Sequence, residues 1–198
     1  NSGYTATVKA SPNAMTLVNS DDVGKATYTV EYYGKDLNSN NYSLVDTAVK
    51  YANAGGSVTA SAKNLTGYTY DSSSSNNVLT GTVTNDGSLV LKVYYNRANY
   101  SISYNMNGGN KANASLYPAA YTYGQTYSLD KPVKAGYDFY GWYADASFEK
   151  RIESITANTN GNLTLHAKWI PAGTILLNDD IYLSFDSEAN GTFTINGS

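Results

Sequence analysis

The sequence repeats itself, and this repeat is the feature that most constrains the fold. Three landmarks recur in the same order, each about 70 residues further along the chain. The paired segments are 28–32 with 100–104, 67–70 with 136–139, and 87–93 with 161–167. We therefore interpret residues 27–97 and 98–171 as two tandem modules with one plan, flanked by partial segments at 1–26 and 172–198.

The landmarks alternate large apolar and polar side chains, which is the two-residue period of a half-buried β-strand. The predicted inward positions of the second module's first strand are Tyr100, Ile102, Tyr104 and Met106. Those of the two closing strands are Leu89, Leu91, Val93 and Tyr95, then Leu163, Leu165, Ala167 and Trp169. One buried and one wet face per strand predicts antiparallel sheets. After the first strand, Asn107-Gly108-Gly109 tolerates positive φ and predicts a hairpin turn.

Two segments carry helical signals. Residues 42–54 fit a helix behind a capping-box spacing at Ser43 and Asp46, or a strand, which we favour. In the strand, one face carries Val45, Thr47, Val49 and Tyr51. Near residues 147–155 we predict a short helix, because Phe148, Ile152 and Ile155 recur at helical spacing behind Ser147.

Composition separates a folded chain from a disordered one. Val, Ile, Leu and Phe make up only roughly a fifth of the 198 residues, but the net charge of −3 supplies little self-repulsion. Twenty tyrosines can build the cores instead, with Trp142 and Trp169 as anchors of the second module. The expected fold class is therefore mostly β, or α+β at most.

The same composition excludes several functions. The 13 basic residues are thinly spread and outnumbered by 16 acidic ones, so no nucleic-acid partner is expected. No apolar run approaches the roughly 18 residues of a membrane span, so we expect no membrane insertion in this segment. The absence of cysteine excludes disulfides, thiolate catalysis and Cys-ligated zinc.

Candidate catalytic and metal-binding groups are sparse. His166 is the only histidine, and alternation places it with Thr164 and Lys168 on an exposed strand face. The carboxylate pairs considered are Asp179 with Asp180 and Glu149 with Glu153. Residues 186–191 copy the start of a calcium loop, but Gly197 stands where such a loop needs a bidentate Glu, so a turn is favoured. We expect no catalytic residue, no metal site and no cofactor.

Both modules resemble known repeats. In residues 98–171 the motifs are Asn107-Gly108-Gly109, Tyr123-Gly124-Gln125, Pro132, the string from Gly136 to Tyr143, and the closing strand from Leu163 to Trp169. This module resembles the Listeria–Bacteroides repeat, also called the internalin B-repeat. Residues 27–97, with Tyr28-Thr29-Val30-Glu31-Tyr32-Tyr33, Gly67-Tyr68 and the segment from Gly87 to Tyr95, more loosely resemble the mucin-binding-protein type of repeat.

The resemblance implies tandem β-grasp, ubiquitin-like modules of an extracellular bacterial cell-surface protein, attached to the cell wall through regions outside this segment. Such repeats serve as stalks and adhesive modules. The function expected is a non-catalytic, monomeric stalk or adhesive segment of a longer chain that contacts host glycoprotein or glycan weakly and multivalently. The alternatives are purely structural spacer repeats and an accessory domain of a larger glycan-active surface enzyme.

Alternation also selects the tyrosines that can meet a ligand. Tyr33 shares a strand face with Thr29 and Glu31, and Tyr94 shares one with Lys92, so both rings point away from the predicted core. Aromatic faces stack on sugar rings, which makes Tyr33 and Tyr94 the predicted glycan-binding residues. The alternative is that these two rings form cross-strand pairs on a solvated sheet.

Overall fold

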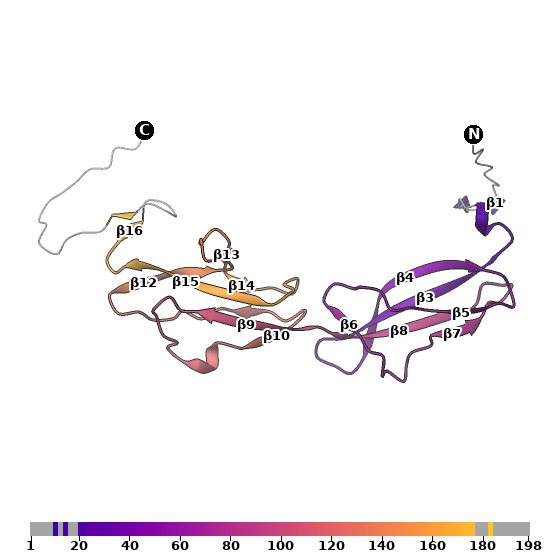
Figure 1. Ribbon diagram of the computed structural model, residues 1–198, viewed down its shortest axis with the longest axis horizontal. Coiled ribbons are helices and arrows are strands. Elements are labelled where there is room, and N and C mark those ends of the chain that lie inside the picture. Colours follow the sequence, from indigo (N-terminus) through magenta and orange to yellow (C-terminus); the bar gives the residue numbers. More distant parts are fainter. Residues whose placement is uncertain (1–9, 12–13, 16–19, 177–181, 184–198) are drawn as a thin grey trace, which may run out of the picture. The chain divides into compact units, whose positions relative to one another are not determined.

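The structure is a computed structural model that describes residues 10–11, 14–15, 20–176 and 182–183 (Figure 1). The chain divides into two compact units, Asn1–Ala98 and Asn99–Ser198, which we call unit 1 and unit 2. The described residues form strands and two short 3-10 helices, η1 (Ser20–Asp22) and η2 (Ala114–Leu116). The prediction of a mostly-β chain is therefore confirmed.

Unit 1 is built on a four-stranded sheet with the spatial order β4-β3-β8-β6. Its strands are β3 (Ala26–Lys35), β4 (Tyr42–Ala52), β6 (Tyr68–Tyr70) and β8 (Val90–Arg97). The small antiparallel pair β5 (Ser57–Thr59) and β7 (Thr80–Thr82) lies outside this sheet. Residues 42–54 are thus a strand over most of their length, as favoured, and the helical alternative is wrong.

Unit 2 is built on a five-stranded sheet with the order β10-β9-β15-β12-β13. Its strands are β9 (Asn99–Asn105), β10 (Ala120–Thr122), β12 (Tyr137–Tyr143), β13 (Arg151–Ile152) and β15 (Leu163–Pro171). A separate antiparallel pair joins β11 (Tyr127–Ser128) to β14 (Ser154–Ile155).

Short two-residue strands precede β3 and follow β15 in the sequence. They are β1 (Ala10–Ser11) paired with β2 (Ala14–Met15), and β16 (Ile175–Leu176) paired with β17 (Tyr182–Leu183).

The central strand pair of each unit is parallel, which corrects the prediction of antiparallel sheets. The first strand of unit 1, β3, runs parallel to the last, β8, and β9 runs parallel to β15 in unit 2. The other neighbours in both main sheets are antiparallel. Alternation tells which side chains share a face but not which way the neighbouring strand runs, so the sequence pattern could not distinguish the two.

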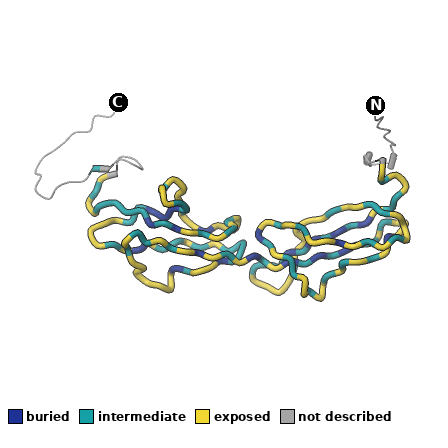
Figure 2. Tube along the Cα trace, viewed as in Figure 1, coloured by how far each residue is buried: buried dark blue, intermediate teal, exposed yellow. Residues whose placement is uncertain are grey.

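Each unit has its own core cluster, and Figure 2 shows buried residues along the strands of both units. In unit 1 the buried side chains are Tyr28, Val30, Tyr32, Ala60, Val83, Leu91, Val93 and Tyr95. In unit 2 they are Ile102, Tyr117, Tyr121, Trp142, Ile155, Leu165 and Ala167. The predicted inward positions of the closing strands lie in or against these cores, so their alternation is confirmed. Tyrosine does supply much of the packing.

The two tryptophans anchor unit 2 to different degrees. Trp142 is 2% exposed, and its indole N–H donates to the Asp130 carbonyl at 2.9 Å. Trp169 is half-buried against the core, and its indole N–H donates to the Met106 carbonyl at 2.8 Å. The Trp169 ring lies so close to Gly109 that a Cβ there would overlap it. Asn107 and Gly108 have positive φ, as predicted, but this turn does not lead directly into a paired hairpin strand.

The helix predicted near residues 147–155 is wrong. This segment forms a turn followed by β13 and β14. The Asp145 carboxylate accepts hydrogen bonds from the Ser147 hydroxyl and from the Glu149 and Lys150 backbone N–H groups. Phe148 has a φ of 60°, in the left-handed region that a right-handed helix cannot use. A side-chain cap from Asp145 therefore closes a loop where the Ser147 signal suggested a helix start.

Candidate functional site: the outer sheet face of unit 1

Tyr33 and Tyr94 lie next to each other on the face of the sheet that points away from the core. They are register partners on the parallel strands β3 and β8. Their rings are stacked, with centroids 4.9 Å apart and planes 9° apart. Tyr42 at the start of β4 meets Tyr94 edge to face, at a centroid distance of 5.0 Å and an angle of 84°. The two rings therefore form the cross-strand pair that the sequence offered as the alternative to a ligand site, and Tyr42 adds a third ring to it.

Polar groups fix this cluster in place. The Tyr33 hydroxyl donates to the Glu31 carboxylate at 2.7 Å, and this hydrogen bond is the main reason that the pKa of Tyr33 is raised to about 12. The Lys92 ammonium lies over the Tyr33 ring, 5.7 Å from its centroid. The Tyr94 backbone N–H donates to the side-chain oxygen of Asn77 at 2.8 Å. At neutral pH Tyr33 is thus a neutral donor beside a carboxylate.

Exposed aliphatic side chains lie on the same sheet face as the rings. Leu44 is 51% exposed, Val49 60% and Val78 45%. The strand register puts Leu44 beside Tyr33, Val49 beside Thr29, and Val78 beside Lys92, so all three share the face of the tyrosine cluster. We call this surface, made of Tyr33, Tyr42, Leu44, Val49, Val78 and Tyr94, the outer face of unit 1.

Unit 2 is polar at the positions that correspond to Tyr33 and Tyr94 in the strand register. The residue that corresponds to Tyr94 by the sequence repeat, Lys168, is polar as well. In unit 1, Tyr33 and Tyr94 directly follow the buried pair Tyr32 and Val93; in unit 2, Asn105 and His166 follow the pair Tyr104 and Leu165 in the same way. The Asn105 amide nitrogen and His166 Nδ1 are 3.4 Å apart. One fold plan therefore carries an aromatic pair in one unit and a polar pair in the other, so the plan itself does not require the aromatic pair.

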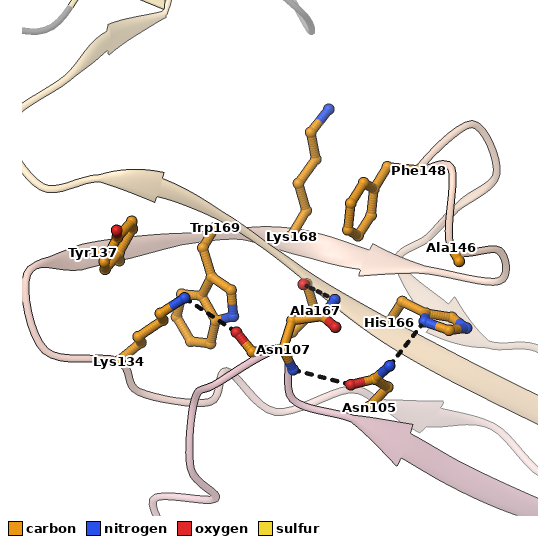
Figure 3. Close-up of a pocket in the computed structure, with 10 residues that line it drawn as sticks. All are labelled: Asn105, Asn107, Lys134, Tyr137, Ala146, Phe148, His166, Ala167, Lys168 and Trp169. Atoms are coloured by element: carbon orange, nitrogen blue, oxygen red, sulfur yellow. Dashed lines mark hydrogen bonds between the residues drawn. The ribbon is translucent and has the colours of Figure 1, made fainter.

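His166 borders a shallow pocket of about 490 Å³ in unit 2 (Figure 3). The ring is half-buried, rather than exposed as predicted, and it shares the strand face of Lys168 as expected. Figure 3 shows Phe148 on the same side of β15 as Lys168, and Asn105 reaching His166 from β9. None of the residues that line the pocket is a carboxylate or a serine, so the lining pairs His166 with neither an acid nor a serine nucleophile.

The described residues support neither a metal site nor a catalytic pair of carboxylates. Within the described ranges, no three His, Cys, Asp or Glu residues are grouped in a way that could hold a metal ion. Glu149 and Glu153 do not share a helix, because their segment is a turn and a strand. Asp179, Asp180, residues 186–191 and Gly197 lie outside the described residues.

Alternation does not predict the contact between Tyr42 and Tyr94. Tyr42 stands at the first position of β4, and the classical bulge opposite Tyr32 and Tyr33 shifts the register of this strand by one residue. Simple alternation counted back from Tyr51 therefore assigns Tyr42 to the wrong face. The positions of Tyr42 and Tyr94 in the sequence do not by themselves predict that the two rings meet.

One comparison with known proteins bears on unit 2. Residues 100–168 match the family model of the Listeria-Bacteroides repeat domain. This repeat is found in extracellular bacterial surface proteins, and the matched residues run from β9 into β15. No curated protein matches the chain. In the part of the chain that the structure describes, no helix is both long and apolar enough to cross a membrane.

Proposed function

We propose that this chain is a non-catalytic stalk and adhesive segment of a bacterial cell-surface protein, and that the outer face of unit 1 binds host glycoprotein or glycan. The observation that carries the proposal is the stacked Tyr33–Tyr94 pair, which shares its sheet face with exposed aliphatic side chains. Unit 2 has the polar pair Asn105 and His166 where unit 1 has these two tyrosines. An exposed apolar patch that the shared fold plan does not require is typical of an interaction surface.

The chemistry of the outer face suits a saccharide. The C–H faces of a sugar ring can pack against the rim of the tyrosine cluster and against Leu44. Sugar hydroxyls can donate to the Glu31 carboxylate, which already accepts from Tyr33. Because Tyr33 and Tyr94 use one ring face on each other, the open contact area is small. Each site is therefore weak, and useful binding comes from many copies.

We also infer that both units are β-grasp modules, with unit 1 of the mucin-binding-protein type. The support is a strand plan that both units share. The first two strands of each main sheet, β3 with β4 and β9 with β10, pair antiparallel. The first of them also pairs parallel with the closing strand, β8 or β15. In both units the segment between the second and third main strands is extended where a β-grasp fold has its helix. Wall attachment is expected to come from regions outside this segment.

A glycan and mucin array tests the proposal. The chain is displayed in many copies on beads, and bound beads are counted for wild type, Tyr33→Ala and Tyr94→Ala. We expect binding to defined glycans that both substitutions remove while unit 1 stays folded, as its circular dichroism spectrum at the assay temperature shows. Tyr137→Ala, which removes a 43% exposed tyrosine in unit 2, is the matched control and should bind as wild type. If the multivalent wild type binds no glycan or mucin, the adhesive function is wrong and the chain is a structural spacer.

A further inference from the structure

The strand β4 forms an open edge of the unit 1 sheet. It is 11 residues long and lies at the end of the order β4-β3-β8-β6. Among the residues that the structure describes, no strand pairs with its other side. Such an edge presents unpaired N–H and C=O groups that can accept another strand. A bulge at Val45 interrupts the strand near its start, so the regular part begins at Asp46.

The regular part of β4 is complementary to itself. If two copies pair antiparallel about a twofold axis at Ala48, Asp46 of each copy lies opposite Lys50 of the other, and Thr47 lies opposite Val49. Two opposite-charge pairs and two β-branched pairs result, all of which favour cross-strand pairing. Moving the axis to Thr47 puts Lys50 opposite Leu44, and moving it to Val49 puts Asp46 opposite Ala52. Only the axis at Ala48 pairs both charges.

The side chains of the edge are ready for this contact. Asp46 carries its negative charge at neutral pH, and a hydrogen bond from the Lys63 ammonium lowers the pKa of its carboxyl further. Lys50 is exposed on the same strand face as Asp46. On the opposite strand face, Val49 is 60% exposed, and pairing would place it against Thr47 of the second copy. The contact would bury part of an exposed valine. The Thr47 N–H, which now donates to the Asp46 carboxylate at 2.7 Å, would exchange this acceptor for a carbonyl of the second copy.

We propose that β4 binds β4 of a second copy of this chain, joining the two unit 1 sheets edge to edge. The short regular stretch makes the pairing weak, so isolated chains are monomers at low concentration and dimers form where copies are crowded. The joined sheets bring two outer faces onto one continuous surface, so a single dimer would present two tyrosine clusters. This proposal goes beyond the adhesive function and needs no glycan.

Charge swapping tests the register. Sedimentation equilibrium is measured up to roughly 1 mM for wild type, Asp46→Lys and Lys50→Asp. We expect wild type to dimerise, and each single variant, which places like charges opposite each other twice, to associate about tenfold or more weakly. Mixing the two variants restores opposite pairs at both sites and should restore a heterodimer. Lys63→Gln is the matched control, because it removes the partner of Asp46 within the chain and leaves the charges of β4 unchanged. It should dimerise as wild type does.

A cysteine pair gives a second, covalent readout, because the natural chain has none. Directly opposite residues in an antiparallel pair have Cα separations within disulfide range, so Ala48→Cys should form an intermolecular disulfide under mild oxidation. Leu44→Cys should form no such disulfide, because the axis at Ala48 places residue 44 opposite Ala52 of the second copy and far from residue 44 of that copy. A wild type that stays monomeric at every concentration, a mixture no better than its components, or equal crosslinking at both positions would overturn the proposal. Circular dichroism checks that each variant is folded.

Discussion

Tyr33 and Tyr94 stack ring on ring at 4.9 Å, across the parallel strands β3 and β8. Their polar counterparts in unit 2, Asn105 and His166, occupy the same register positions and have the same separation along the chain. The pair is therefore an addition to the fold plan, whereas Tyr28, Tyr32 and Tyr95 on the other face are part of its core.

The energetic roles of these two groups of tyrosines should differ. Tyr94→Ala should lower the free energy of unfolding by about 1–2 kcal/mol, because Tyr94 is half-buried and loses mainly its stacking partner. Tyr95→Ala should cost about 3–5 kcal/mol, because Tyr95 is 1% exposed and its hydroxyl donates to the Lys63 carbonyl at 3.0 Å. Urea unfolding measures both. Equal losses would mean that the outer pair is as structural as the core.

Tyr33 should ionise later than a free tyrosine. The Glu31 carboxylate stabilises the protonated phenol and raises its pKa to about 12 in the folded state, from 10.0. Folding is therefore favoured by this group below pH 10, and the contribution is lost as pH rises from 10 towards 12. Subtracting the tyrosinate absorbance titration of Tyr33→Phe from that of wild type isolates the group. Glu31→Gln should return the pKa towards 10; an unchanged titration would contradict the assigned cause.

Asp145 should make unit 2 sensitive to acid. Hydrogen bonds from Ser147, Glu149 and Lys150 lower the pKa of its carboxyl to about 2 from 3.8. The stabilisation is present above pH 3.8 and is lost as pH falls towards 2. Asp145→Ala should remove this acid dependence and loosen Phe148 from Tyr143, whose rings meet edge to face at 5.5 Å. Near-ultraviolet circular dichroism between pH 2 and pH 5 reports it, and Asp138→Ala serves as the control carboxylate.

Gly109 should be intolerant of any side chain. A Cβ at this position would overlap the ring of Trp169, although the backbone itself is not in the left-handed region. Gly109→Ala should therefore cost roughly 2 kcal/mol through steric displacement of the indole. Trp169→Phe in the same chain should recover part of that loss, which a double-mutant cycle measures. Additive losses would show that the contact is not the cause.

The periodicity of the chain was sufficient to predict the first and closing strands of each unit and their inward residues, because alternation is a local property. It did not predict the buried Tyr117 and Tyr121, which lie outside those strands. It could not predict that β3 and β8 run parallel, since strand direction is decided by how some 50 intervening residues cross the sheet. It also failed at 147–155, where one carboxylate, Asp145, outweighs the helical spacing of three apolar residues. The contact between Tyr33 and Tyr94 needed both the face and the register, and alternation supplies only the face.

The parallel central pair has a mechanical consequence. The chain enters unit 1 at one end of β3 and leaves at the opposite end of β8, the strand beside it. Tension between these two points slides the strands past one another and loads their shared hydrogen bonds together, whereas a hairpin pulled at its open end yields one bond at a time. The same holds for β9 and β15 in unit 2. Each unit is thus arranged to resist being drawn out by its ends.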